Sequence, residues 1–563
     1  MKLAKYLPMV ALLLAPFAAQ QLNAQILQGN VAGSSALFLE AGQGVYNSGG
    51  NNCVWTAAKG TVTATDTRPG VGLAENGTFW AGWLIDAGSG GTSCANPGTN
   101  APVYTYLNLD STLGDRCLFA QPSCTISTAA TAGTAGQTPS VLGSAYTDTA
   151  LPAGVLAAFN NQPVTVAGTD ILPMDARFAT YQALALCGPL SAGTQFQGYG
   201  YGPGPVGQAI KSFYSTASFH VVDFNIFGND PINTSSAIPA YSITPVGAQP
   251  VVVAVNTSDA SGFGLASITN INRGTLGLIY GGLLVRTADV LPQAFAGTGA
   301  TYFPITALLR EHLSGTYNTF DHAIPNNKEI YRPQESGNCT TGTDTVLTNP
   351  MNQTRTVGAT TGARNRVIGT GQMVSELQAV TDSIGYAFWS AGNFAGVTHL
   401  KYLTVDGVDP INDNYSVGNG ALPPDLTKVT LSHVADGSYP IWSELRLIST
   451  SAQGLTAATA LAGFAQAQVS FGAGATQPDF ITPASLSVIH SHFGRPFINF
   501  NSTNTAFEGP RVCGPSSPAE DGGDVGGLVF SLQAAADYAV LKGNYNTSSC
   551  LGITSVASFG VLQ

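Results

Sequence analysis

The stretch YFPITALLREHLSGTYNTF, residues 302–320, joins an extended apolar run to a helix-like run through a polar corner. The apolar part is typical of a buried strand, and Ser314, Gly315 and Thr316 stand where the following helix begins. The N–H groups in the first turn of a helix lack partners within the helix and lie at the positive end of its dipole. Arg310, at the end of the strand, can donate two hydrogen bonds to an oxyanion. The corner is therefore compatible with an anion site, but the chemistry alone favours a simple helix cap with a surface ion pair.

Around this corner, short apolar runs that indicate strands alternate with helix-like segments. The strands are expected at 163–168, 219–227, 250–256, 302–309 and 444–449, and the helices at 154–161, 274–284, 316–324 and 371–380. This alternation predicts an α/β fold with largely parallel sheets. Residues 47–150 differ, because they are rich in Gly, Thr and Asn and hold four cysteines. We expect them to form an insertion of loops and irregular β-structure.

The N-terminal segment MKLAKYLPMVALLLAPFAAQQLNA, residues 1–24, has the layout of a cleaved secretory signal. Lys2 and Lys5 precede a short apolar core, and small residues lead to a cleavage site after Ala24. No later segment offers the roughly 18 uninterrupted apolar residues that a membrane-spanning helix needs. The sequence therefore predicts a periplasmic or secreted protein with no membrane span in the mature chain.

All eight cysteines follow this segment, and an even count in an oxidising compartment predicts disulfide bonds. Pairing between neighbours along the chain gives Cys53–Cys94, Cys117–Cys124 and Cys513–Cys550, which leaves Cys187–Cys339. No CxxC motif is present, which argues against a zinc ribbon or a thioredoxin-type site.

The chain is poorly charged and acidic. Charged residues make up 9%, and the net charge is −11. An acidic chain disfavours nucleic acid or an anionic membrane surface as a partner. A small anion remains compatible with this charge, because local hydrogen-bond donors hold such a ligand.

Several blocks, in order, resemble the periplasmic phosphate-binding proteins, whose hallmark is Arg, two residues and Gly-Ser-Gly-Thr before a helix. Besides 310–320, the blocks are VAGSSALF (31–38), GVLAAFNNQPVTVAGTD (154–170), VGAQPVVVAVN (246–256), GTLGLIYGG (274–282), SIGYAFW (383–389) and YPIWSELRLIS (439–449). These proteins are type 2 solute receptors of phosphate ABC importers.

The resemblance implies a two-lobed type 2 periplasmic-binding-protein fold, α/β, with a ligand cleft between the lobes. Lobe 1 would comprise residues 25–254 and 441–563, including the insertion at about 47–150, and lobe 2 would comprise residues 255–440. The implied function is capture of an oxyanion, phosphate foremost, for uptake or scavenging. It implies no enzyme activity and no cofactor, a monomer, and an ABC permease as a partner.

The same resemblance assigns ligand-binding roles to seven residues. They are Ser34 and Ser35 in the first loop, Asp170 after a strand, and Arg310, Ser314, Gly315 and Thr316 from the opposite lobe. Asp170 would accept the proton of hydrogen phosphate, and this would disfavour sulfate, which has no proton to donate. Asp230 is the rival carboxylate because it lies closer to the crossing strand, but Asp170 has the better flanking match.

The chain departs from the family pattern at three places. His312 stands where the family usually has an acidic residue paired with the motif Arg, and Leu313 replaces the motif's first Gly. The family's Gly-Ser-Ser-Gly helix start has two weak matches, at 144–154 and at 197–207. A cationic His312 would strengthen anion binding below about pH 6.5.

The other motifs are weaker indications of function. Gly202, Gly204 and Gly207 match GxGxxG, but they lack a clear strand-to-helix junction. A structural role is expected for His490 and His492, and a solvated turn for DGVDPINDN (406–414), so no metal site is predicted. Two other functions stay open, a structural or adhesive surface protein and a secreted hydrolase that uses a serine with one of the seven histidines.

Overall fold

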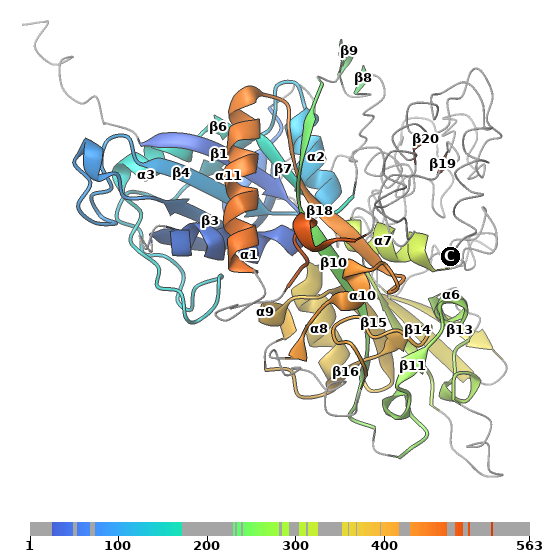
Figure 1. Ribbon diagram of the computed structural model, residues 1–563. Helices are drawn as coiled ribbons and strands as arrows, with labels where there is room; N and C mark the ends of the chain where they lie inside the picture. Colours follow the sequence, from blue (N-terminus) through green and yellow to red (C-terminus); the bar gives the residue numbers. More distant parts are fainter. Residues whose placement is uncertain are drawn as a thin grey trace, which may run out of the picture.

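The computed structural model describes the core of the chain. The described residues are 25–48, 53–67, 74–171, 229–230, 233–237, 240–259, 261–280, 284–291, 303–310, 314–324, 352–357, 360–367, 369–394, 396–415, 428–469, 479–487, 494–495 and 520–521. They form two α/β bodies side by side, joined by two long strands (Figure 1).

One hydrogen-bonded sheet of 14 strands runs through both bodies within the described residues. In the first body its strands are, in spatial order, β7 (Val166–Thr169), β1 (Ile26–Gly33), β4 (Pro102–Asn108), β3 (Ala74–Trp83), β2 (Val54–Thr65), β5 (Thr125–Thr128) and β6 (Gln162–Pro163). In the second body they are β13 (Asn352–Val357), β14 (Thr360–Arg366), β12 (Thr306–Leu309) and β15 (Ser383–Phe388). The pairs β1–β4, β1–β7, β12–β14 and β12–β15 are parallel. The other nine pairs of this sheet among the described residues are antiparallel, so the expectation of largely parallel sheets is wrong.

Two strands, β10 (Ser242–Asn256) and β18 (Trp442–Ser449), join the bodies. The first half of β10 pairs with β18, and its second half pairs with β15 and with β16 (Leu400–Tyr402). The run PVVVAV in β10 is completely buried, which is the pattern of a strand covered on both faces. Because β18 also pairs with β7, the sheet passes from one body to the other without a break.

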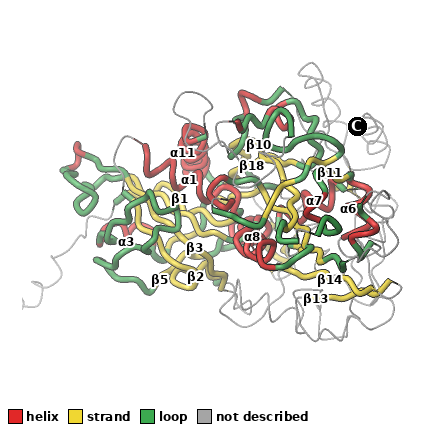
Figure 2. Tube along the Cα trace, turned by 90° about the horizontal axis from the view of Figure 1, so that it is seen from below, coloured by secondary structure: helices red, strands yellow, loops and turns green. Residues whose placement is uncertain are grey.

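Helices cover both faces of the sheet in the first body (Figure 2). On one face lie α1 (Ser35–Asn47) and α11 (Ala452–Gln468), and on the other lie α2 (Ser111–Phe119) and α3 (Ala153–Phe159). The helices α1 and α11 approach closely at Gly44, where an added Cβ would lie 2.4 Å from the carbonyl oxygen of Phe464. A larger residue at this position would therefore separate the two helices.

The second body repeats this layered plan. The helices α6 (Arg273–Tyr280) and α7 (Gly315–Ala323) pack on one face, where Phe320 stacks on Tyr386 with ring centroids 3.9 Å apart. The helices α8 (Gly369–Ala379), α9 (Ala391–Phe394) and α10 (Ser432–Ala435) pack on the other face. Three small two-stranded sheets complete the described elements: β8 (Asn229–Asp230) with β9 (Asn233–Ala237), β11 (Asn270–Ile271) with β17 (Thr404–Val405), and β19 (Gly494–Arg495) with β20 (Glu520–Asp521).

The expected α/β fold class, with two lobes and disulfide-containing β-rich structure, is confirmed by this arrangement. The segment 47–150 contains the antiparallel pair β2–β3 and two disulfides, Cys53–Cys94 and Cys117–Cys124, as the neighbour pairing predicts. It is more regular than expected, since β4 and α2 belong to the main sheet and its covering layer. The other four cysteines and residues 1–24 lie outside the described residues.

In the part of the chain that the structure describes, no helix is both long enough and apolar enough to cross a membrane.

Candidate functional site: the cleft between the two bodies

Four strands are each followed along the chain by a helix. These connections are β1 to α1, β4 to α2, β12 to α7 and β14 to α8. Neighbouring parallel strands have their carboxyl ends at the same edge of a sheet, so in each body the helix starts gather at one edge. The starts of α1 and α2 belong to the first body and those of α7 and α8 to the second, and the contacts described below bring them together.

The start of α1 is fixed by a close backbone contact. Gly33 has φ of 140°, and an added Cβ there would lie 2.0 Å from the carbonyl oxygen of Gly168. The next N–H, that of Ser34, donates to the same oxygen at 2.7 Å. The Ser34 hydroxyl accepts a hydrogen bond from the Ala36 N–H at 3.2 Å, and this caps the helix. The chain can therefore turn sharply from β1 into α1 at this point.

Asp170 follows β7 and is buried, with 1% of its surface exposed. The hydroxyls of Ser111 and Ser34 hydrogen-bond to its carboxylate, and Gly315 packs against it from the second body. A Cβ on Gly315 would lie 1.9 Å from Asp170 Oδ1, so only glycine fits at this position.

Burial raises the pKa of Asp170 from 3.8 to about 6, and this effect outweighs its backbone hydrogen bond and the positive charge of Arg310, which both lower it. Near neutral pH the carboxylate is therefore mostly ionised and can accept hydrogen bonds.

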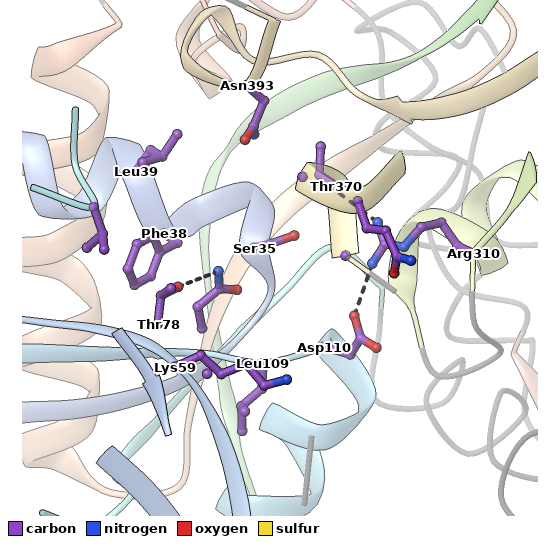
Figure 3. Close-up of a pocket in the computed structure, with 16 residues that line it drawn as sticks. Ser35, Phe38, Leu39, Lys59, Thr78, Leu109, Asp110, Arg310, Thr370 and Asn393 are labelled. Carbon is purple, nitrogen blue, oxygen red and sulfur yellow. Dashed lines mark hydrogen bonds and ion pairs between the residues drawn. The ribbon is translucent and has the colours of Figure 1, made fainter. Parts of the chain in front are cut away.

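Arg310, at the end of β12, is 1% exposed. Its Nη1 donates to the hydroxyls of Thr316 and Thr370, each at 3.4 Å, and its Nη2 lies 3.3 Å from Oδ1 of Asp110 in the first body. Figure 3 shows Arg310, Thr370 and Asp110 facing one another across the cleft. The guanidinium thus joins the two bodies and donates hydrogen bonds to two hydroxyls.

The start of α7 has the geometry that the polar corner predicts. The Ser314 hydroxyl accepts a hydrogen bond from the Tyr317 N–H at 3.3 Å and caps the helix. Ser314 and Thr316 are buried, with 1% and 3% of their surfaces exposed. Ser314 thus caps the helix and Arg310 pairs with an acid, as the alternative expects, but the ion pair is buried and not at the surface.

A pocket of about 300 Å³ opens beside these residues. Its lining comes from both bodies: Ser35, Phe38, Leu39, Lys59, Gly77, Thr78, Asn108, Leu109, Asp110, Val141, Arg310, Gly369, Thr370, Gly371, Gln372 and Asn393. Of the seven predicted residues, Ser35 and Arg310 line this pocket. Ser34, Asp170 and Gly315 form a packed cluster that does not line it, and neither do Ser314 and Thr316.

Asp110, Ser111 and Thr370 were not among the site residues predicted from the sequence. The helix start that meets Asp170 is the beginning of α2, whereas both proposed matches, 144–154 and 197–207, lie elsewhere in the chain. The alternating run VYTYLNL (103–109) followed by Asp-Ser-Thr is a strand that leads into a helix cap, and it could have revealed Asp110 and Ser111. No local signal marks Thr370, because its contact with Arg310 is long-range.

Several predicted features cannot be compared with the structure. His312 and Leu313, the glycines at 202–207, and His490 and His492 lie outside the described residues. The backbone of Asp230 lies in β8, apart from the main sheet.

The acidic segment at 406–414 forms a turn, but its middle is buried and not solvated as expected, with Asp409 2% and Asn412 3% exposed. Asp409 accepts hydrogen bonds from the N–H groups of Ile411 and Asn412 at 2.8 and 2.9 Å. Among the described residues, no group of three His, Cys, Asp or Glu side chains could hold a metal ion.

No protein-family model and no curated protein matches the chain. Solved structures similar to it include PstS from Borrelia burgdorferi, at 11% identity over 78% of this chain and 92% of that one, with a TM-score of 0.29. A phosphate-binding protein from Stenotrophomonas maltophilia is 15% identical over 59% of this chain and 80% of that one, with a TM-score of 0.28. An ABC-type phosphate transport receptor from Vibrio cholerae is 14% identical over 40% of this chain and 66% of that one, with a TM-score of 0.23.

The chain thus spans slightly less than two thirds of the Vibrio receptor. At TM-scores of this size the similarity does not identify a ligand, so the proposals below rest on the geometry of the cleft.

Proposed function

We propose that this protein is an extracytoplasmic solute-binding protein that captures an oxyanion, phosphate foremost, in the cleft between its two bodies. The observation that carries this proposal is the buried Arg310, which lies where the starts of α2, α7 and α8 meet. A buried guanidinium beside helix starts attracts an anion through charge and through donors in fixed positions.

The carboxylate of Asp170, which interacts electrostatically with Arg310 although it does not line the pocket, would add selectivity to this site. A buried carboxylate repels an oxyanion that has no proton, but it accepts a hydrogen bond from one that does. With a pKa of about 6, Asp170 is mostly ionised at neutral pH and can accept the proton of hydrogen phosphate. We therefore expect phosphate and arsenate to bind and sulfate to be disfavoured.

The two bodies would act as the lobes of a receptor that closes on its ligand by hinge motion. We propose residues 25–254 and 441–563 as lobe 1 and residues 255–440 as lobe 2, with β10 and β18 as the connection. In an uptake system the partner would be an ABC permease. The protein would be a monomer in the periplasm or the medium, exported by the signal at residues 1–24.

Binding rather than catalysis fits the serines of the cleft. The hydroxyls of Ser34 and Ser314 accept helix-capping hydrogen bonds, and Ser111 donates to Asp170. The histidines whose side chains are described, His399 and His433, do not line the pocket. No nucleophile–base pair is therefore formed by these serines and either of those histidines.

Equilibrium dialysis with radiolabelled phosphate tests this function, with sulfate, arsenate and a phosphonate as competitors. The Arg310→Ala variant should lose saturable binding. The Arg273→Ala variant should keep it, because Arg273 pairs with Asp406 away from the pocket. If the unaltered protein bound none of these oxyanions saturably, the proposal would be wrong, and a structural or adhesive role would take its place.

A further inference from the structure

The pocket in the cleft is larger than an oxyanion. Its volume is about 300 Å³. One water occupies roughly 30 Å³ in the liquid, so the pocket equals about ten waters, several times the space that a tetrahedral oxyanion fills. Volumes of about 300 Å³ and above are typical of sites for small organic ligands.

This volume remains although the two bodies already touch around the pocket. Arg310 lies 3.3 Å from Asp110, and Gly315 packs against Asp170. Asp479, which hydrogen-bonds to Glu40 of α1, also accepts a hydrogen bond from the Ala391 N–H at the start of α9, at 2.7 Å. The two bodies are therefore already in contact on several sides of the pocket, which itself is partly open to solvent.

The pocket has two chemically different ends. Arg310, Thr370 and Asp110 form a polar end, while Phe38 and Leu39 of α1 lie at the other (Figure 3). Leu109 and Val141 add apolar surface to the lining. An inorganic oxyanion has no group that could bury this apolar surface.

The charges of the lining favour one anionic group. The charged lining residues are Lys59, Asp110 and Arg310, two cations and one anion. Lys59 is exposed and comes from the bulge of β2, between Ala57 and Val62. The side-chain amides of Asn108, Gln372 and Asn393 supply neutral hydrogen-bonding groups between the charged and apolar parts.

We propose that the cleft binds a phosphomonoester of a small, partly apolar alcohol. This inference rests on the proposed function, because it uses the same Arg310 site. The phosphate group binds at Arg310 and Thr370, and the organic group covers Phe38, Leu39 and Val141. Inorganic phosphate then fills only the polar end of the pocket and binds more weakly.

Isothermal titration calorimetry on the full-length mature protein, with phenyl phosphate and inorganic phosphate in parallel, tests the inference. Phenyl phosphate should bind at least about tenfold more tightly than inorganic phosphate, because it buries apolar surface that the smaller ion leaves exposed. The Leu39→Asn and Val141→Thr variants should lose most of this advantage and keep their affinity for inorganic phosphate. Leu455→Asn is the matched control, because Leu455 is 39% exposed on α11 and does not line the pocket.

Each outcome separates the two proposals. If inorganic phosphate bound as tightly as phenyl phosphate or more tightly, the phosphomonoester inference would be wrong and oxyanion capture would stand. If phenyl phosphate bound and inorganic phosphate did not, the inference would be supported, and phosphate would be replaced as the proposed ligand. If neither bound, both proposals would fail.

Discussion

The helix α2 contributes to two buried Arg–Asp ion pairs in different surroundings. At its start, Asp110 lies 3.3 Å from Arg310 of the other body, and both groups line the pocket. Inside the helix, Arg116 lies 2.9 Å from Asp66, which follows β2 in the same body. Both pairs are almost completely buried, but only the first joins segments that belong to different bodies.

The two pairs have the same chemistry but different surroundings, so we expect them to have different roles. The Arg116–Asp66 pair is shut inside one body, so each charge depends on the other for solvation. The Arg310–Asp110 pair has a pocket beside it, and two hydroxyls lie 3.4 Å from Arg310 Nη1. A ligand can therefore compete with Asp110 for Arg310, and we expect the first pair to govern stability and the second to govern binding.

The largest expected effect comes from breaking the enclosed pair. Arg116→Met should lower the free energy of unfolding by about 3–5 kcal/mol, because it leaves the Asp66 carboxylate buried without its cation. Denaturant unfolding measures this change. The double variant Arg116→Met/Asp66→Leu should recover most of the loss, and Arg310→Met should cost less, because the pocket admits water to Asp110. Equal losses for the two single variants would contradict the distinction between the pairs.

A pH titration of stability sharpens the comparison, because each arginine lies near a carboxyl group whose pKa it lowers. Burial raises the pKa of Glu75 from 4.5 to about 7 against the charge of Arg116, and that of Asp170 from 3.8 to about 6 against the charge of Arg310. Both groups bind their protons more tightly in the folded state. Their contribution to stability is therefore complete below the unfolded pKa values and is lost as pH rises through the folded ones.

The free energy of unfolding of the unliganded protein should accordingly fall between about pH 4 and pH 7, by about 3 kcal/mol for each group. Chemical denaturation at a series of pH values measures it. Glu75→Gln and Asp170→Asn should each flatten part of the curve. A profile in which neither substitution changed the slope would show that these carboxyl groups titrate normally.

A smaller effect follows from changing the shape of the cleft cation while its charge is kept. Arg310→Lys should raise the Kd for phosphate about 30-fold, because an ammonium group is a point charge and cannot donate two parallel hydrogen bonds. Calorimetric titration with phosphate measures the change. Unaltered affinity would mean that charge alone, and not the geometry of the guanidinium, holds the ligand.

The smallest predicted effect concerns the carboxylate that faces this cation. Asp110→Asn should strengthen sulfate binding about tenfold, because it removes one negative charge from the pocket. The Asp110 side chain makes no capping hydrogen bond to α2, so this helix should start normally. Competition between sulfate and labelled phosphate provides the measurement, with Asp86→Asn as the control outside the pocket. Unchanged or weaker sulfate binding would show that Asp110 does not repel the ligand.

The sequence predicted the parts of the cleft whose signals are local. Ser314 caps α7 as the polar corner indicates, and Asp170 follows its strand and meets the opposite body. The expectation that these separate segments converge came from the resemblance to phosphate-binding proteins. Local hydrophobic periodicity does not indicate which distant segments meet. Their roles in ligand binding stay predictions.

The residues that were not predicted lie in a segment that was expected to form loops, or make contacts that only long-range packing produces. Asp110 and Ser111 follow a strand inside a segment whose Gly- and Thr-rich composition suggested loops, so their strand-to-helix corner was overlooked. The pairing of Asp110 with Arg310 spans 200 positions in the sequence, and only the packing of the two bodies produces it. The pocket has the same origin, since its lining comes from both bodies.

The position of β18 has a consequence for the order of folding. This strand pairs with both β7 and β10, so it fills the gap between the two halves of the sheet. Until residues 442–449 have been synthesised, β7 has only β1 beside it, and α11, which packs on α1, comes later still. The first body therefore cannot complete its core while the ribosome is still making the second, and its folding waits for contacts of very large sequence separation.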